Sequence, residues 1–123
     1  MLQLESKVNE RSYLLTAYEK SRVAEAKFIL LQDISGRSLT IRELSRAVAL
    51  NEFKLKLGFK QMYGTGIFEC LTEARMEKAR ELLITTTKPI KEICTIAGYP
   101  RMTNFITAFR KKFGYTPGSL RRK

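Results

Sequence analysis

The chain has 123 residues and a mass of 14.2 kDa, and its 44% hydrophobic and 28% charged residues are typical of one globular domain. Twenty-three lysines and arginines against twelve acidic residues give a net charge of +11, and the chain has no histidine. This composition argues against histidine-dependent nucleophilic catalysis and against histidine-containing zinc sites. No apolar run approaches the roughly 20 residues that a membrane helix needs. Cys70 and Cys94 form no CxxC pair, so we expect reduced thiols in a cytoplasmic protein.

The positive charge is unevenly distributed along the chain. Residues 1–36 carry five basic and five acidic side chains, so the whole excess lies in residues 37–123. No acidic residue follows Ile93. Such a distribution favours a polyanionic partner, which could be nucleic acid, an anionic membrane surface or an acidic protein.

The beginning of the chain predicts a linker followed by a helix. Residues 1 to about 20 are polar and mixed, as expected for a linker or an extension from an upstream domain. Residues 22–32 have helical periodicity, and residues 33–38, which include Gly36, fit a loop. We therefore expect the folded domain to begin near residue 21.

The remainder of the chain contains the same unit twice. Ile41-Arg-Glu-Leu44 resembles Ile90-Lys-Glu-Ile93 at an offset of 49 residues. Downstream the offset is 50: Leu55, Phe59, Lys60, Tyr63 and Gly64 correspond to Phe105, Phe109, Arg110, Phe113 and Gly114. One residue is therefore inserted between the two halves of the second copy.

Each copy is predicted to form a helix, a tight turn and a second helix. Thr40 and Glu43 fit a capping box, and Asn51 suits the N-cap of the next helix. In the second copy Pro89 is tolerated only in a first helical turn, and Gly98 can supply a left-handed residue at the turn. Apolar residues at helical spacing are interpreted as core: Leu55, Phe59, Phe105 and Phe109.

Residues 67–83 predict a long helix between the two copies. Apolar residues follow helical spacing along it, and the carboxylates are interleaved with Arg75, Lys78 and Arg80. We interpret these carboxylates as a solvated helix face and not as catalytic groups: Glu69, Glu73, Glu77 and Glu81. The expected fold is all-α and homeodomain-like, with helix-turn-helix units at about 40–63 and 89–113 joined by a connecting helix at about 66–84.

Several motifs in a fixed order resemble the AraC/XylS-type transcription regulators, whose DNA-binding domain has two helix-turn-helix units joined by a long helix. The similarity covers about residues 21–123, and the segment 51–60 is most similar to the subgroup that controls siderophore uptake. The motifs are Leu44-Ser45 with Asn51 and Leu55-x-x-x-Phe59-Lys60; Leu71-x-x-x-Arg75-Met76-x-x-Ala79-x-x-Leu82-Leu83; and Ile93-x-x-x-Ala97-Gly98-Tyr99, Asn104-Phe105 and Ala108-Phe109-Arg110-Lys111-x-Phe113-Gly114-Tyr115-Thr116-Pro117.

The resemblance implies that the second helix of each unit enters the DNA major groove. Transferred by position, base-facing side chains are expected at Phe53, Lys56 and Leu57 in the first unit and at Met102, Thr103, Ile106 and Thr107 in the second. Phosphate contacts are expected from Lys54, Lys60, Arg75, Arg101 and Arg110. For Arg75 a salt bridge inside the domain is an equal alternative. Leu57 and Thr107 replace the long polar or basic residues common at these positions, so we expect little direct readout there.

The resemblance further implies a bacterial, sequence-specific transcription regulator, either activator or repressor, without catalysis, metal or cofactor. Its partners would be double-stranded DNA and RNA polymerase, with no membrane. An effector would act only through an N-terminal domain outside this chain, and the fragment itself would be monomeric. The alternatives are a non-specific, architectural nucleic-acid-binding protein and, less favoured, a DNA-repair methyl acceptor that uses Cys70.

Three further residues or segments carry expectations of their own. Cys94 falls at a small core position and is interpreted as a structural thiol. Gly58 lies inside a predicted helix at a cost of roughly 1 kcal/mol relative to alanine, which predicts a neighbour too close for a side chain. Residues 121–123 are expected to be a flexible basic tail that adds to DNA affinity.

Overall fold

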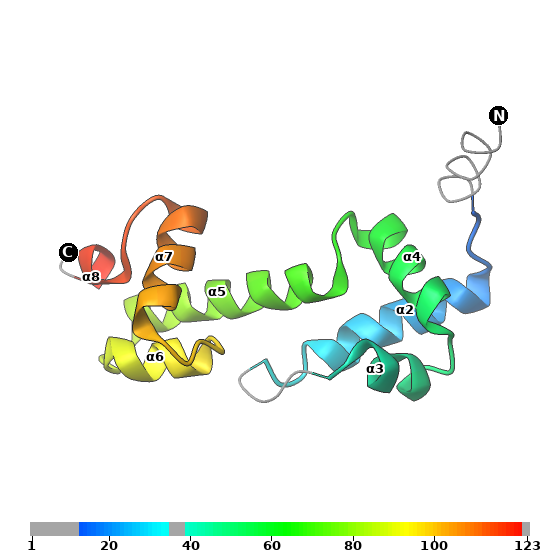
Figure 1. The fold of residues 1–123 in the computed structure, drawn as a ribbon, viewed down its shortest axis with the longest axis horizontal. Helices are drawn as coiled ribbons and strands as arrows, with labels where there is room; N and C mark the ends of the chain where they lie inside the picture. Colours follow the sequence, from blue (N-terminus) through cyan, green and yellow to red (C-terminus); the bar gives the residue numbers. More distant parts are fainter. Residues whose placement is uncertain (1–12, 35–38, 122–123) are drawn as a thin grey trace. The chain divides into compact units, whose positions relative to one another are not determined.

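A computed structural model describes residues 13–34 and 39–121, and within them the regular structure consists of helices alone. The all-α class expected from the sequence is confirmed. None of the helices in these residues combines the length and the apolar character that a bilayer crossing needs. In chain order the helices are α2 (Ala17–Leu30), α3 (Ile41–Ala47), α4 (Glu52–Tyr63), α5 (Ile67–Thr85), α6 (Ile90–Ile96), α7 (Met102–Phe113) and α8 (Pro117–Arg121) (Figure 1).

The chain forms two compact units. The described part of the first unit comprises residues 13–29 and 39–67, and that of the second comprises residues 30–34 and 68–121. The first unit therefore holds α3 and α4 with most of α2, and the second holds nearly all of α5 with α6, α7 and α8. Each unit contains one of the two sequence repeats.

Helix α2 begins earlier than its periodicity predicts. The Thr16 hydroxyl accepts a hydrogen bond from the Glu19 N–H, and the Glu19 carboxylate accepts one from the Thr16 N–H, each 3.0 Å long. This reciprocal capping starts the helix at Ala17 and not at Arg22. The linker expected over residues 1–20 is therefore wrong for residues 13–20, which belong to the first unit. Residues 1–12 lie outside the described residues.

The helix caps predicted in the first repeat are confirmed. Thr40 and Glu43 form the capping box of α3, with bonds of 2.9 and 3.0 Å between each side chain and the other residue's N–H. The Asn51 side chain accepts from the Lys54 N–H at 2.7 Å and caps α4. Both helices of the unit thus start where local side-chain chemistry satisfies their free N–H groups.

The two repeats use the same turn. Ala49 and Gly98 have φ of 54° and 85°, the left-handed conformation that reverses the chain between the two helices. The residue after each turn donates its N–H back to the first helix, from Leu50 to Ser45 at 3.0 Å and from Tyr99 to Cys94 at 3.1 Å. The left-handed role predicted for Gly98 is confirmed.

The second helices of the repeats also match each other. Both α4 and α7 have twelve residues, and each ends at a left-handed glycine whose N–H bonds a carbonyl one turn back at 2.8 Å. The inserted residue lies between Tyr99 and the α7 N-cap Arg101, where the first repeat passes directly from Leu50 to its N-cap Asn51. The extra residue thus lengthens the connector and leaves both helices intact.

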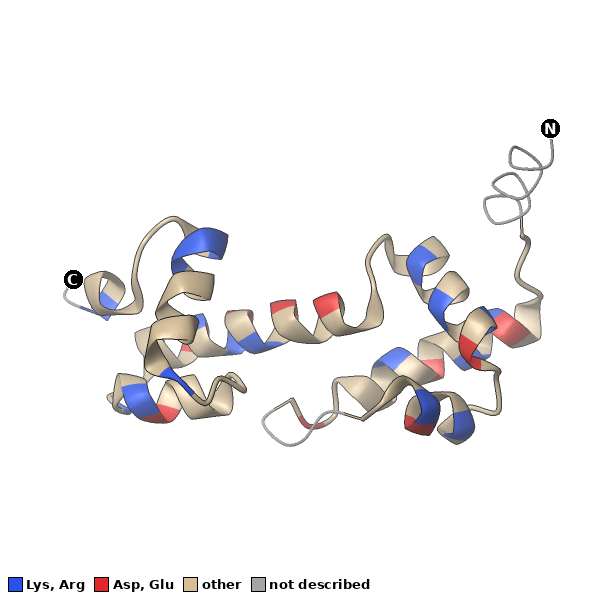
Figure 2. Ribbon diagram, in the orientation of Figure 1, with Lys and Arg blue, Asp and Glu red and all other residues tan. Residues whose placement is uncertain are grey.

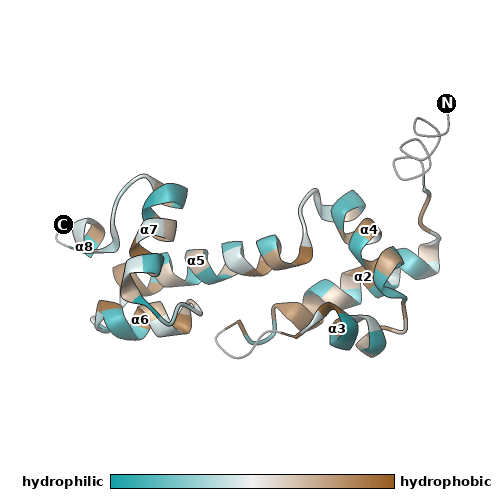
Figure 3. Cartoon of the chain, viewed as in Figure 1, coloured by the Kyte–Doolittle hydropathy of each residue, from teal (hydrophilic) through white to brown (hydrophobic). Residues whose placement is uncertain are grey.

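The buried residues are those that helical spacing selects. Leu55, Phe59, Phe105 and Phe109 have no exposed surface, so their interpretation as core is confirmed. Figure 3 shows hydrophobic and hydrophilic residues sharing each helix, as expected when one face packs inward. In the second unit one cluster joins α5, α6 and α7: Met76, Ala79, Leu83, Ile93, Cys94, Ala97, Phe105 and Phe109.

Two sequence interpretations of polar groups also hold. The Cys94 thiol is buried, donates to the Tyr99 carbonyl at 3.1 Å, and has its pKa raised by that burial, as expected for a structural thiol. The four carboxylates at spacing of four along α5 are all exposed, and Glu81 pairs with Lys78 at 3.2 Å. They form the solvated helix face that was predicted.

The short helix α8 closes the end of α5. The Arg121 guanidinium donates to the carbonyls of Thr86 at 3.0 Å, Leu82 at 3.3 Å and Leu83 at 3.4 Å, and also to the carbonyl of Lys88. Leu82 and Leu83 lie in the last turn of α5, where carbonyls have fewer partners within the helix. The expected flexible tail is therefore wrong for Arg121, and Arg122 and Lys123 lie outside the described residues.

We expect Arg121→Ala to lower the free energy of unfolding by about 1–3 kcal/mol, because several half-buried carbonyls lose a charged donor. Lys111→Ala, which removes an exposed cation from α7, is the control and should change the unfolding midpoint little. Urea unfolding followed by circular dichroism measures both. Equal midpoints for the two variants would contradict a structural role for Arg121.

Gly58 lies where α4 packs against α2 and the segment before it. A Cβ atom added at this position would lie 2.8 Å from Val23 Cγ2 and 3.2 Å from Leu15 Cδ2. A valine side chain is stiff at χ1 and yields little. The close neighbour predicted from the sequence is confirmed.

We expect Gly58→Ala to lower the thermal midpoint, because overpacking costs about 1–3 kcal/mol whereas helix propensity returns only about 1 kcal/mol. Gly118 in α8 is the matched control, since nothing lies within 4 Å of its added Cβ. Gly118→Ala should leave the midpoint unchanged or raise it. A midpoint that rises for Gly58→Ala would show that the packing can adjust.

Candidate nucleic-acid interface

Helix α4 buries one face and exposes the other. Leu55, Gly58 and Phe59 are buried, and Lys56 and Phe53 are exposed, with 58% of Phe53 accessible to solvent. Leu57 is half-buried at the edge of the same outer face. Helical spacing of three and four residues therefore brings the three predicted base-facing residues of this unit together. Their contact with bases remains a prediction.

Helix α7 repeats this arrangement in the second unit. Phe105 and Phe109 are buried, and Met102, one turn before Phe105, packs against their cluster. The other three predicted base-facing residues lie away from this core face: Thr103, Ile106 and Thr107. Thr103 and Thr107 are exposed, and Met102 and Ile106 are half-buried. The structure therefore brings Thr103, Ile106 and Thr107 together but turns Met102 toward the core, and contact with bases stays a prediction for all four.

The two outer faces have the same geometry and different chemistry. At the repeat offset of 50 residues, Phe53 corresponds to Thr103, Lys56 to Ile106, and Leu57 to Thr107. The first unit thus presents an aromatic ring and an ammonium group where the second presents a hydroxyl and an aliphatic side chain. Equivalent positions of the two units therefore offer different hydrogen-bonding and apolar groups.

Three of the predicted phosphate-binding residues lie free on the surface of their helices. Lys60 and Arg110 occupy the last turns of α4 and α7, and Arg101 is the N-cap of α7; all three are exposed. Arg110 is followed by Lys111 and Lys112, and α7 contains no acidic residue (Figure 2). Cations placed along the rim of a helix can reach the phosphates on either side of a groove.

Lys54 is held within the first unit. Its ammonium lies 3.1 Å from the Glu19 carboxylate, which also accepts from the Tyr13 hydroxyl at 3.1 Å. The hydrogen bond from the Thr16 N–H, followed by the contact with Lys54, lowers the pKa of Glu19. Its hydrogen bond to Glu19 raises the pKa of Lys54. The pair is therefore fully charged at neutral pH.

Arg75 is held within the second unit. Its Nε donates to the Ile34 carbonyl at 2.6 Å, and its guanidinium lies against Gly98, where an added Cβ would be 2.8 Å from Nη1. Gly98 therefore leaves room for the arginine as well as forming the turn. Arg75 has a structural role beside the turn of the second repeat, and its contact with phosphate remains a prediction.

Four side chains that position these helices escaped the sequence interpretation. The Thr16-x-x-Glu19 pattern is a capping-box signature that the sequence does contain, and it predicts the start of α2. Lys27, whose ammonium lies 4.1 Å from the centre of the Tyr63 ring, and Arg121 carry no such local signal. Only the tertiary contacts show what these two residues do.

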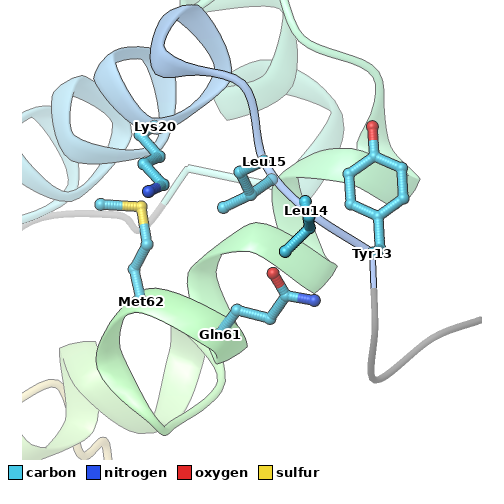
Figure 4. A pocket seen from close by; sticks show the side chains of 6 residues that line it. All are labelled: Tyr13, Leu14, Leu15, Lys20, Gln61 and Met62. Carbon is cyan, nitrogen blue, oxygen red and sulfur yellow. The ribbon is translucent and has the colours of Figure 1, made fainter. Parts of the chain in front are cut away.

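A shallow hollow of about 420 Å³ lies beside the inner side of α4. Figure 4 shows Lys20 of α2 beside Met62 of α4, with Leu14 and Leu15 to one side of them, above Gln61. No predicted base-facing residue lines it, so it is separate from the outer face of α4. Within the part of the chain that the structure describes, no cluster of cysteine and acidic side chains is suited to bind a metal ion.

Comparison with known proteins finds the same architecture in transcription regulators. A family model described as a helix-turn-helix domain matches residues 44–123. The xylose operon regulatory protein of Escherichia coli (strain K12) is 33% identical over 85 residues, which are 69% of this chain and 22% of that protein. The bifunctional transcriptional activator/DNA repair enzyme AdaA of Bacillus subtilis (strain 168) is 31% identical over 83 residues, which are 68% of this chain and 39% of that protein.

A solved structure shows a similar fold. The crystal structure of a transcriptional regulator with an AraC-type DNA-binding domain, from Chromobacterium violaceum, superposes with a TM-score of 0.76 at 27% identity. The match covers 87% of this chain and 95% of that one. By contrast, this chain spans only about a fifth of the length of the xylose regulatory protein.

Proposed function

Because the chain belongs to the AraC/XylS family of helix-turn-helix regulators, we propose that it is the sequence-specific DNA-binding part of a bacterial transcription regulator. The observation that carries this proposal is the duplicated outer face. Each unit exposes one side of its second helix, free of acidic residues at the predicted base-facing positions and rimmed by cations. Two such faces in one chain suit two segments of one DNA site.

The mechanism follows from what each outer face can offer. Lys56 can donate to guanine O6 and N7, whereas Phe53 and Leu57 can contact thymine methyl groups. In the second unit, Thr103 and Thr107 offer a hydroxyl and a methyl each, and Ile106 and the accessible part of Met102 offer apolar contacts. Because few of these groups discriminate strongly, part of the sequence preference would come from how easily the intervening DNA bends.

Phosphate contacts would set the register of each helix on the duplex. We propose Lys60, Arg101 and Arg110 as the main contacts, since these side chains are exposed on the rims of α4 and α7. At α7 no side chain caps the first N–H groups, which are then available to a phosphate. Lys54 and Arg75 complete the predicted set, and each would first have to leave, or share, its partner within the protein.

The remaining parts of the proposal concern partners. Double-stranded DNA and RNA polymerase would be the partners of this part of the protein in the cytoplasm, where a bacterial chromosome lies. This segment would act as a monomer, and an effector would bind in a different part of a longer protein. We propose no catalysis and no cofactor: Cys70 is half-buried on α5, and alkylating it should leave DNA binding unchanged.

We expect the affinity for DNA to fall steeply with salt. If six to ten phosphates are contacted, the slope of log K against log salt concentration should be roughly −5 to −9. Fluorescence anisotropy with a labelled duplex over a range of salt concentrations measures the slope. Competition with random DNA should show a preference for the target site of about a thousandfold or more. A slope shallower than about −2 would favour an acidic protein partner, and an absent preference would favour an architectural binder.

We expect one chain to protect a bipartite, non-palindromic site whose two segments lie about 34 Å apart on one DNA face. Lys56→Ala should relax the preference in one segment only, and Thr103→Ala or Thr107→Ala in the other, at about 1–3 kcal/mol per base pair. Lys111→Ala, outside the base-facing sets, is the control and should weaken all sequences equally. Selection from random duplexes with each variant measures these preferences. The two-unit mechanism is wrong if both sets relax the same bases.

A further inference from the structure

The inner side of α4 is held at three levels along its axis by α2 and the segment before it. Lys54 pairs with Glu19 in the first turn, and Gly58 packs against Val23 in the middle. In the last turn, the Tyr63 ring lies under the Lys27 ammonium, 4.1 Å from its centroid. These contacts fix the rotation of α4 about its axis, and therefore which side chains form its outer face.

Glu19 is the most constrained member of this set. Only 7% of its surface is exposed, and its two oxygens accept from the Thr16 N–H at 3.0 Å, the Tyr13 hydroxyl at 3.1 Å and the Lys54 ammonium at 3.1 Å. Lys54 is less buried, with 37% of its side chain exposed. The carboxylate is therefore anchored, and the lysine is the partner that could move.

We propose that Glu19 is a positioning residue that withholds the charge of Lys54 from the DNA backbone. This inference rests on the proposed DNA-binding function, and it gives Lys54 a role different from the phosphate contact that family resemblance implies. Turning the ammonium toward a phosphate would leave the nearly buried Glu19 carboxylate without its counter-charge. The new contact would therefore replace one charged pair with another and gain little.

The pairing of Glu19 with Lys54 would affect how strongly the protein prefers its target site over other DNA. A cation that contacts phosphate strengthens binding to every sequence, whereas the outer face of α4 distinguishes between sequences. By neutralising Lys54, Glu19 would keep non-specific affinity low and leave Lys60 as the phosphate contact of this helix. The ratio of specific to non-specific affinity would then be larger than the number of cations on α4 suggests.

Glu19→Gln tests the inference because the amide oxygen can still accept from the Thr16 N–H and the amide NH2 can donate to the Tyr13 hydroxyl oxygen, while the negative charge is lost. Freed from its pair, Lys54 should contact a phosphate, and the slope of log K against log salt should steepen by about 0.9. Preference for the target over random DNA should fall. Glu25→Gln, on the same helix, is the matched control for the loss of one acidic charge and should leave the slope unchanged.

Two variants of α4 complete the test. Lys54→Met alone should leave the slope unchanged, whereas Lys60→Met should make it shallower by about 0.9. In the Lys54→Met background, Glu19→Gln should no longer steepen the slope. The pair is also measurable without DNA: the carboxyl pKa of Glu19, followed by NMR, should rise toward its ordinary value when Lys54 is replaced.

The outcomes distinguish this inference from the proposed function. If the unaltered chain binds its site normally but Glu19→Gln leaves the slope unchanged, or steepens it equally without Lys54, the inference alone is overturned. A slope that becomes shallower in Lys54→Met, or a Glu19 pKa that does not respond to Lys54, overturns it as well. If the unaltered chain shows no preference for any DNA sequence, the proposed function fails and this inference fails with it.

Discussion

The left-handed residue between the two helices of each repeat is the constraint on which the rest of the structure depends. At Ala49 and Gly98 the chain leaves one helix and enters the next within a few residues, and the following N–H bonds back to close the turn. For alanine this left-handed conformation costs about 1–2 kcal/mol, whereas for glycine it carries no such cost. The burial of Val48 and Leu50 on either side of Ala49 offsets that cost. With the turn closed, the face that each second helix can bury is already decided.

The outer faces of α4 and α7 are a consequence of that burial. Once Phe59 and Phe109 occupy their cores, Lys56 and Thr107 remain exposed, and Leu57 and Ile106 remain half-buried beside them. Duplication therefore preserved the backbone and the core, while the outer side chains diverged. One scaffold presents two chemically different surfaces, which is what reading two different DNA segments requires.

Several lysines and arginines of this very basic chain stabilise the fold, in addition to or instead of binding a polyanion. Lys54 is paired with Glu19, Arg75 donates to a backbone carbonyl beside the turn of the second repeat, and Arg121 satisfies the carbonyls at the end of α5. Each of these ammonium or guanidinium groups is partly shielded from water, and a partly buried charge is stable only with a partner close by. Net charge alone therefore overstates how many cations are available to DNA.

The sequence by itself determined the repeat, the caps of α3 and α4, the turn at Gly98 and the core positions, because each depends on residues within one or two helical turns. The capping box that starts α2 is equally local. It was missed because it lies within residues 1–20, whose composition resembles that of a linker. Tertiary structure alone decided the partners of the long cations. Arg75 and Ile34 are 41 positions apart, and Arg121 reaches carbonyls 33 to 39 positions away. Helical periodicity predicts which face of a helix a residue occupies. The group that a charged side chain contacts depends on which distant segment packs against that face.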